Sequence, residues 1–385
     1  MIYLDSAATT LQKPPQVARA SAWAMGHLAS PGRGGHSAAM AAADTAFACR
    51  QEAARLFHLS DPERVVFTFN ATHGLNIAIK SLVRPGSTVV ISGYEHNAVT
   101  RPLHAIPNVT VRVAESPLFD RRGAVEAFRS AITPEVSAVV CCHVSNVFGF
   151  ILPVEEIAGL CRERNVPLIV DASQSAGCVP LDMEALGAAY MAMPGHKGLY
   201  GPQGTGLLLC GDTVPQPLLE GGTGSASLVQ TMPDFLPDRL EAGTHNVAGI
   251  AGLLEGLRFV RRTGEENIGL RESALIRRLS ANLEQIPGIT LFRARDPRAQ
   301  AGVLSLQVEG MDSEELGERL GRRRVAVRAG LHCAPLAHKT AGTLEEGTVR
   351  LSVSAFNQPW EMDAAVHGKW RRKRRSPYEA LYSPH

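Results

Sequence analysis

Apolar runs alternate with stretches of helical spacing through the first two-thirds of the chain. We predict strands at five runs rich in valine and isoleucine: residues 65–68, 89–92, 109–113, 138–142 and 166–170. Helical spacing is found at residues 75–82, 125–132 and 154–164. Continuous apolar strands separated by helices are typical of a parallel sheet covered on both faces. Ligands of such sheets bind beyond the carboxyl ends of the strands, so the residues that follow each strand are the first candidates for a site.

The pattern changes after a helical stretch at residues 248–262, which we predict to connect the first domain to a second one. Four further strands are predicted beyond it, with helices between them: residues 289–292, 303–308, 325–328 and 349–353. We therefore expect an α/β protein with a large domain at residues 1–255 and a smaller α+β domain at residues 256–385. The first 15 or so residues are expected to pack near the small domain. The basic segment at residues 369–377 reads as a solvated terminus.

Composition narrows the function classes. The chain has 385 residues, of which 45% are hydrophobic, enough for a large core and two domains. A formal net charge of +2 gives no argument for a nucleic-acid partner. The first residues lack the basic and apolar regions of a secretory signal, and no apolar run approaches the ~18 residues that span a bilayer. We expect a soluble cytoplasmic protein that does not bind membranes.

The seven cysteines form no CxxC pair and no zinc spacing, so no metal site is expected. Cys141, Cys142 and Cys210 lie in apolar runs and are predicted as reduced core residues. Cys333 differs because it follows His332 in a loop-like segment. A cysteine beside a histidine on an exposed loop is a candidate nucleophile with a lowered pKa.

Lys197 and Asp171 indicate a specific chemistry together. Lys197 lies in an uncharged segment rich in glycine and proline, directly after the apolar residues 188–192. A desolvated lysine has a lowered pKa, and its neutral amine forms a Schiff base with an aldehyde. Asp171 ends a predicted strand, where its carboxylate could pair with a protonated pyridine nitrogen. Each signal is weak alone, since a lysine before glycine is usually a loop residue and an aspartate there is often a cap. Together they are the two groups that pyridoxal phosphate chemistry needs most.

Other polar residues follow the same predicted strands. The loop at residues 70–74 joins a strand to a helix, so its N–H groups and the Thr72 hydroxyl could hold a phosphate, although a threonine there could also be an ordinary N-cap. His96 could stack on a cofactor ring or shuttle protons. Asn146 also ends a strand. Arg350 lies inside an apolar strand and is costly to bury without an anion, which favours a grip on a substrate carboxylate.

Seven motifs in order carry a resemblance to a known family. They are YLDSAATT (3–10), YEHN (94–97), HVSN (143–146), VDASQSAG (170–177), GHK (195–197), EAGT (241–244) and RAGLHCA (328–334). The chain resembles the class V aminotransferase-fold enzymes that use pyridoxal phosphate, from about residue 2 to about residue 357. Within them it is most similar to the cysteine desulfurases with a short RxGxHC loop.

The resemblance implies a fold and a set of cofactor contacts. The fold is the aspartate aminotransferase-like fold type I, with a mainly parallel sheet in its large domain. Lys197 would bind pyridoxal phosphate covalently, Asp171 would pair with the pyridinium nitrogen and Gln174 would bond the ring hydroxyl. His96 would stack over the ring. The phosphate would be held by Thr72, His73 and His196, and by Thr244 from the second subunit of a homodimer.

The resemblance also implies substrate contacts and a reaction. Asn146, Arg350 and Ala7 would bind the substrate, with Asn146 and Arg350 on its carboxylate. Cys333 would accept sulfur from L-cysteine, giving L-alanine and a persulfide. The acceptor that takes the sulfur onward, a small thiol, a carrier protein or a cluster scaffold, is not identified. Two positions depart from the family pattern: Pro194 replaces a serine of many relatives, and His73 replaces a frequent acidic residue.

Three alternatives to a desulfurase stay open at this point. A selenocysteine lyase uses the same scaffold, and comparing the turnover of L-cysteine and L-selenocysteine separates the two. A class V transaminase, epimerase or other lyase would not need Cys333. A non-catalytic regulator or scaffold protein is the remaining possibility, but it gives no physical reason to keep a buried lysine and a buried arginine.

Overall fold

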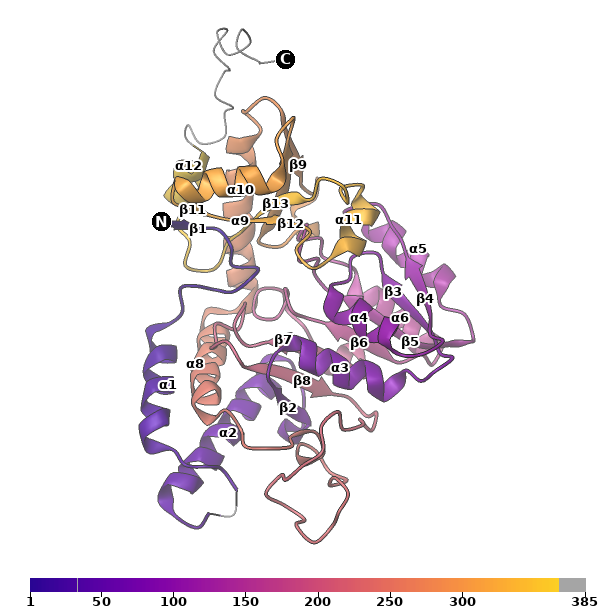
Figure 1. The fold of residues 1–385 in the computed structure, drawn as a ribbon, viewed down its shortest axis with the longest axis vertical. Coiled ribbons are helices and arrows are strands. Elements are labelled where there is room, and N and C mark those ends of the chain that lie inside the picture. The colour runs from indigo at the N-terminus through magenta and orange to yellow at the C-terminus, as the bar shows by residue number, and fades with distance from the viewer. Residues whose placement is uncertain (33, 367–385) are drawn as a thin grey trace, which may run out of the picture.

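The apolar runs of the first two-thirds of the chain form one seven-stranded sheet in the computed structural model, which describes residues 1–32 and 34–366. The strand order is β2-β8-β7-β6-β5-β3-β4 (Figure 1). The strands are β2 (Val65–Thr68), β3 (Thr88–Ser92), β4 (Thr110–Ala114), β5 (Val136–Cys142), β6 (Leu168–Asp171), β7 (Tyr190–Pro194) and β8 (Gly206–Cys210). Neighbours from β4 to β7 are parallel, whereas β8 is antiparallel to both β2 and β7. The sheet is therefore mainly parallel, as predicted.

Helices cover both faces of this sheet. One apolar cluster joins it to α3 (Ala71–Leu82) and α4 (Asn97–Ala105). A second cluster joins its other face to helices that include α2 (Ser37–Leu56), α5 (Arg121–Ala131), α6 (Val154–Glu163) and α8 (Val247–Thr263). The helix α1 (Pro15–His27) packs along α8 (Figure 1). Burial on both faces explains why the strands read as unbroken apolar runs.

The last third of the chain forms a smaller antiparallel sheet with the order β12-β13-β10-β9. Its strands are β9 (Ile289–Phe292), β10 (Val303–Val308), β12 (Arg328–Gly330) and β13 (Thr348–Ser352). A separate apolar cluster packs this sheet against α9 (Glu265–Leu283), α10 (Ser313–Arg322) and α12 (Pro359–Val366). The helix α11 (Pro335–Ala341) instead buries Ala337 in the core of the large sheet.

The N-terminal residues pair with the last third of the chain rather than with the large sheet, and β1 forms a separate two-stranded sheet there. Strand β1 (Ile2–Tyr3) pairs in parallel with β11 (Val325–Ala326) (Figure 1). Asp5, two residues further on, forms a bridge with Ser352. The single strand predicted at residues 325–328 is therefore wrong. The chain divides there into β11, which pairs with β1, and β12, which pairs with β13.

Two helices begin earlier than the apolar spacing of the sequence predicts. Helix α3 begins at Ala71 rather than near Leu75, because the side chain of Asn70 accepts a hydrogen bond from the N–H of His73 and caps it. Helix α5 begins at Arg121, capped by Asp120. Short helices complete the fold: η1 (Pro62–Arg64), α7 (Met183–Leu186), η2 (Asp238–Leu240) and η3 (Pro297–Ala299).

Two further observations concern the limits of the described chain. The basic segment at residues 369–377 lies outside the described residues. Within residues 1–32 and 34–366, none of the helices combines the length and the apolar character needed to cross a bilayer.

Candidate active site

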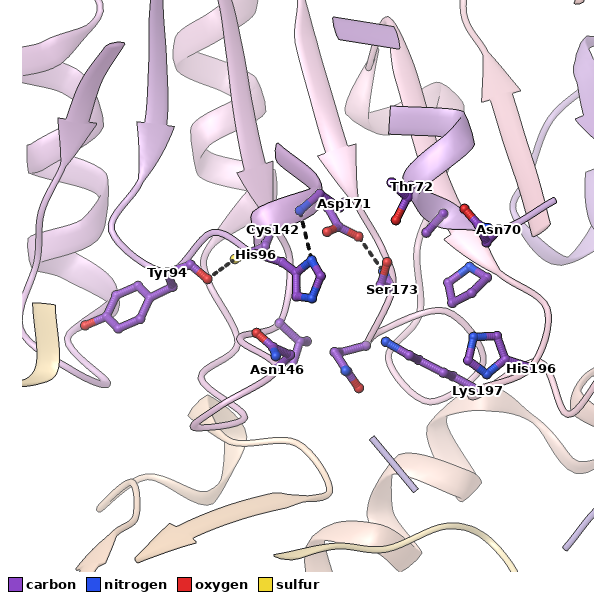
Figure 2. A pocket seen from close by; sticks show the side chains of 15 residues that line it. Asn70, Thr72, Tyr94, His96, Cys142, Asn146, Asp171, Ser173, His196 and Lys197 are labelled. Atoms are coloured by element: carbon purple, nitrogen blue, oxygen red, sulfur yellow. Dashed lines mark hydrogen bonds between the residues drawn. The ribbon is translucent and has the colours of Figure 1, made fainter. Parts of the chain in front are cut away.

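A cavity of about 550 Å³ lies where the carboxyl ends of β3, β5, β6 and β7 meet (Figure 2). This is the edge at which parallel sheets bind ligands. Seven of the residues singled out by the sequence line it: Thr72, His96, Asn146, Asp171, Gln174, His196 and Lys197. Strand order thus brings together side chains that are up to 125 residues apart in the chain, from Thr72 to Lys197.

Lys197 follows β7 and extends its side chain into this cavity (Figure 2). Burial lowers the pKa of Lys197 to about 8, although the nearby Asp171 carboxylate acts in the opposite direction. Within residues 1–32 and 34–366, its Nζ has no hydrogen-bond partner. A substantial fraction of this amine is therefore neutral near pH 8, where an ordinary lysine would be almost fully charged.

Asp171 and His96 form the wall opposite Lys197 (Figure 2). Asp171 is 4% exposed, and one carboxylate oxygen accepts a hydrogen bond from the N–H of Ser173 at 2.9 Å, which leaves the other for a ligand. The Nδ1 atom of His96 accepts from the N–H of Ala98 at 3.0 Å, so the neutral ring carries its proton on Nε2. Burial lowers the pKa of His96, while Asp171 opposes that shift.

The N-terminus of α3 forms another part of the wall. Thr72 lies in its first turn with an exposed side chain, and the first N–H groups of a helix have no partners within the helix. His196 lies nearby, with its Nδ1 atom 3.0 Å from the Thr9 hydroxyl. Burial, with a smaller contribution from the Lys197 charge, lowers the pKa of His196 to about 4, so the ring is neutral at pH 7. This region offers neutral hydrogen-bond donors to an anion.

Gln174 and Ala7 connect the cavity to the N-terminal segment. The Gln174 side-chain amide donates to the Ala7 carbonyl at 3.0 Å. The Ala7 N–H in turn donates to the Ser352 hydroxyl at 2.8 Å. Ala7 does not line the main cavity but shares a smaller adjoining one with Gln174 and Lys197. Both residues therefore lie beside the amine.

His73 and Thr244 lie elsewhere, in a second cavity of about 520 Å³. His73 stacks on Phe69, with ring centroids 4.7 Å apart, and its Nε2 is buried without a partner in the described part of the chain. Thr244 is exposed and follows Glu241, which forms a buried ion pair with Arg50 at 2.6 Å. Within a single subunit the structure does not bring these two residues to Lys197.

Arg350 lies behind the Asn146 wall rather than in the cavity lining. It is 2% exposed and donates from Nη1 to the Asn146 carbonyl at 2.9 Å. Its Nη2 donates to Asp5 at 3.1 Å, and its Nε is buried without a partner among residues 1–32 and 34–366. Burial lowers the pKa of Arg350, and Asp5 is the nearest opposing charge. The anion that makes burial of Arg350 tolerable is thus Asp5.

Cys333 lies between β12 and α11, and it is the one exposed cysteine of the seven. The carbonyl of Cys333 accepts from the N–H of Asn97 at 2.8 Å, and the carbonyl of His332 accepts from Asn146 Nδ2 at 2.8 Å. Both residues adopt left-handed backbone angles, with φ of 50° and 56°. Loops of the large sheet therefore hold the thiol-bearing loop against the cavity wall.

His332 does not play the part that the sequence suggested beside Cys333. Its Nε2 lies 3.1 Å from the Thr348 carbonyl, and burial lowers its pKa to about 2. A neutral ring that is bonded to Thr348 supplies no positive charge to the thiol. We therefore correct the expectation that His332 activates Cys333.

Sequence reasoning missed two acidic residues around the site. Asp5 appeared only as part of a motif, yet it pairs with both Arg350 and Arg328. Glu95 is fully buried, and burial raises its pKa to about 8. Its carboxyl accepts from the Cys142 N–H at 2.7 Å, below the cavity wall. Neither residue carries a signal of its own in the sequence, because Asp5 meets Arg350 only through the pairing of β1 with β11 and Glu95 is one acidic residue among many.

These side chains fit a small aldehyde that carries a phosphate and a basic ring nitrogen. The Lys197 amine has no partner in the described chain, Asp171 has a free carboxylate oxygen, and the start of α3 offers anion donors. In the described residues, no cluster of histidine, cysteine and carboxylate side chains suits a metal ion.

Comparison with known proteins agrees with this geometry. The family Aminotransferase class-V matches residues 2–364. A probable cysteine desulfurase of Methanothermobacter thermautotrophicus is 32% identical over 374 residues, covering 94% of this chain and 92% of the relative. A probable cysteine desulfurase of Mycolicibacterium paratuberculosis is 31% identical and also covers 94% of this chain, but the chain spans only 54% of that relative.

A solved structure supports the same fold. The apo structure of a cysteine desulfurase from Thermococcus onnurineus NA1 superimposes with a TM-score of 0.87. The two sequences are 28% identical, and the match covers 95% of this chain and 92% of the other. The α/β fold expected from the sequence, with a large mainly parallel sheet and a smaller C-terminal sheet, is therefore confirmed.

Proposed function

This chain belongs to the aminotransferase class-V family, whose members depend on pyridoxal phosphate, and from that premise we propose that it is a cysteine desulfurase. The reaction converts L-cysteine to L-alanine and leaves the sulfur atom as a persulfide on Cys333. One observation carries the proposal. Lys197, whose pKa is lowered, and the Asp171 carboxylate share a cavity, and the exposed thiol of Cys333 lies on a loop that is hydrogen-bonded to the wall of that cavity.

Lys197, Asp171 and the start of α3 would hold the cofactor. Lys197 would supply the amine for its aldehyde, and Asp171 would accept a hydrogen bond from its protonated ring nitrogen. Thr72 and His196 would contact its phosphate, and His96 would cover its ring. The chemistry supplied by bound pyridoxal phosphate is an electron sink for the substrate carbon that loses its proton. Thr244 would act at the phosphate from the second subunit of a homodimer, because within one subunit it lies in the second cavity, as does His73.

The substrate would be oriented from the opposite wall. Asn146 would bind its α-carboxylate, with Arg350 behind it as the second donor, which would place its amine toward Lys197. The Lys197 amine then takes the proton from the α-carbon, a step that needs the neutral form of the amine. Burial of Lys197 thus serves the reaction because it supplies that form near neutral pH.

Cys333 would carry out the sulfur transfer. Its thiolate attacks the substrate sulfur, the new S–S bond forms and the bond from sulfur to the β-carbon breaks. The electron pair of that bond stays on the β-carbon, which takes a proton and becomes the methyl group of alanine. The sulfur is oxidised and the carbon is reduced, so no external oxidant or reductant is needed. The exposed position of Cys333 leaves the persulfide open to a sulfur acceptor, whether a small thiol or a carrier protein.

The test is intact-protein mass spectrometry of the cofactor-loaded protein after incubation with L-cysteine and no reductant. We expect a gain of one sulfur atom, mapped to the Cys333 peptide, with release of one equivalent of alanine. Cys333→Ser should abolish the gain and keep the cofactor absorbance. The proposal fails if the loaded wild-type protein leaves L-cysteine intact, or if the serine variant transfers sulfur at the normal rate.

The same experiment separates the alternative reactions. A selenocysteine lyase would convert L-selenocysteine with little turnover of L-cysteine and would tolerate Cys333→Ser. A transaminase would form a keto acid and release no sulfur. The structure favours the desulfurase because it holds the Cys333 loop at the cavity wall through Asn97 and Asn146.

A further inference from the structure

Asp5 lies between two arginines of the small sheet, where its charge is not needed for the fold of its own segment. The backbone around it is held by the bridge to Ser352 and by the hydrogen bond from the Ser352 N–H to the Leu4 carbonyl at 2.8 Å. Its side chain is 13% exposed and contacts both Arg350 and Arg328. These two arginines face each other across the β12–β13 pair.

The contact with Arg350 is incomplete. A carboxylate that binds an arginine side-on uses Nε and Nη2 together. In Arg350, Asp5 takes only Nη2, at 3.1 Å, and Nε is buried without a partner in the described chain. The surface pair Arg278–Asp363 shows the complete arrangement, with contacts of 2.7 Å from Nε and 2.6 Å from Nη2.

The contact with Arg328 uses both nitrogens. Nη2 of Arg328 lies 3.0 Å from Asp5 Oδ2, and its Nε lies 3.3 Å from both carboxylate oxygens. The Arg328 side chain is 52% exposed and can follow a rotating carboxylate, whereas the Arg350 side chain is 3% exposed and fixed by Asn146. Asp5 can therefore leave Arg350 and keep a full ion pair.

We propose that Asp5 is a resident competitor on Arg350, which the α-carboxylate of an amino-acid ligand displaces from Nη2 onto Arg328. The ligand carboxylate then occupies both Nε and Nη2 of Arg350. This inference rests on the proposed function only in taking an α-amino acid as the ligand.

Asn146 connects these charged residues to the cavity that holds the amine. Arg350 donates to the carbonyl of Asn146, which lines the same cavity as Lys197, so Arg350 is the arginine offered to the carboxylate of an amino acid bound there. The charges of Arg350, Arg328 and Asp5 also act on the pKa of Lys197. The single contact between Asp5 and Arg350 weakens ligand binding, because it must be broken first.

The test is the affinity of the cofactor-loaded protein for L-alanine, measured by absorbance titration, with L-alaninamide as the ligand that lacks a carboxylate. Asp5→Asn keeps the shape of the side chain and removes the charge. We expect it to tighten L-alanine binding about tenfold, the effect of one charge-assisted contact that no longer has to be broken. Binding of L-alaninamide should be unchanged.

A second variant should change the affinity for L-alanine in the opposite direction. Arg328→Gln removes the partner to which Asp5 moves, so the Asp5 carboxylate stays on Arg350 and L-alanine binding should weaken several-fold. Asp363→Asn removes the ion pair with Arg278, which joins two helices that pack on the small sheet. It should change the affinity for neither L-alanine nor L-alaninamide. Thermal unfolding of all three variants checks that they fold.

The inference is overturned if Asp5→Asn weakens L-alanine binding or leaves it unchanged, or if L-alaninamide binding changes equally. These outcomes do not depend on sulfur chemistry. A wild-type protein that binds L-alanine but leaves L-cysteine intact would refute the proposed desulfurase activity alone. In an active enzyme, Asp5→Asn should lower the KM for L-cysteine and not for cysteamine.

Discussion

The two groups to which the proposed function assigns chemistry, the Lys197 amine and the Cys333 thiol, are held in opposite ways. Lys197 follows a central strand of the large sheet, and its neighbours Asp171 and His96 follow strands on the same edge. Cys333 lies on a loop between β12 and α11 of the small sheet, is exposed, and takes a left-handed backbone angle together with His332. The Lys197 amine is thus built into the core of the large sheet, whereas the loop that carries the Cys333 thiol is attached to it by hydrogen bonds.

The difference fits two tasks. Proton transfer at the substrate needs an amine fixed to within a fraction of an ångström, and strand ends of a packed sheet provide that. A thiol that receives sulfur and then passes it on needs access to two partners in turn, which a loop allows. The carbonyls of His332 and Cys333 are the anchors, since Asn146 and Asn97 donate to them.

The largest expected effect comes from removing the amine. Lys197→Ala should lower the rate of alanine formation by at least about 10³-fold, because the group that moves the proton is lost. Borohydride should no longer fix the cofactor to the protein. Lys80→Ala, at the exposed end of α3, is the matched control and should be fully active. Substantial activity in Lys197→Ala would break the comparison, since the fixed amine would then not be essential.

A smaller effect is expected from breaking the hydrogen bond that holds the Cys333 loop to the wall of the Lys197 cavity. Asn146→Ala removes the hydrogen bond to the His332 carbonyl and leaves that buried acceptor unpaired, at a cost of about 1–3 kcal/mol. We expect persulfide formation on Cys333 to slow about 10- to 100-fold, with the cofactor absorbance unchanged. Asn267→Ala removes a similar bond to the Thr263 carbonyl on the surface and serves as control. Equal losses in both variants would indicate a general loss of stability instead.

The smallest effect concerns pH and sharpens the account of the amine. Burial holds the pKa of Lys197 at about 8, so the neutral fraction of the amine rises as pH rises through that value. Capture of pyridoxal phosphate by the cofactor-free protein should therefore increase about tenfold from pH 7 to pH 9 and then level off. The rate is followed by absorbance, with Lys197→Ala as the blank. A rate still rising steeply above pH 10 would mean that the amine titrates like an ordinary lysine.

Local signals explain what could be predicted from the sequence. Lys197 and Asp171 follow apolar strands within about 30 residues of each other, and the parallel sheet then requires that both lie at one edge. The start of α3 was predicted too late because its first turn is polar and the apolar spacing begins only at Leu75. The cap at Asn70 was the better signal.

Features that depend on pairing between distant segments could not be predicted. Residues 325–328 read as one strand because three apolar residues follow one another, and only the pairing with β1 divides them between two partners. Asp5 is an ordinary acidic residue in its own segment and becomes the counter-ion of Arg350 only through that pairing. The placement of Thr72 and His73 in different cavities likewise follows from the turn of a helix rather than from their adjacency.

The pairing of β1 with β11 also sets an order for biosynthesis. Strand β1 leaves the ribosome before its partner β11, because Val325 is made more than 300 residues after Ile2. At typical rates of about 5–20 residues per second, β1 waits for roughly 15–60 s before it can pair. The large sheet can close in that interval, whereas Asp5 reaches Arg350 only after that arginine has been made. The ion pair between Asp5 and Arg350 thus forms late, when the strands of the large sheet are already complete.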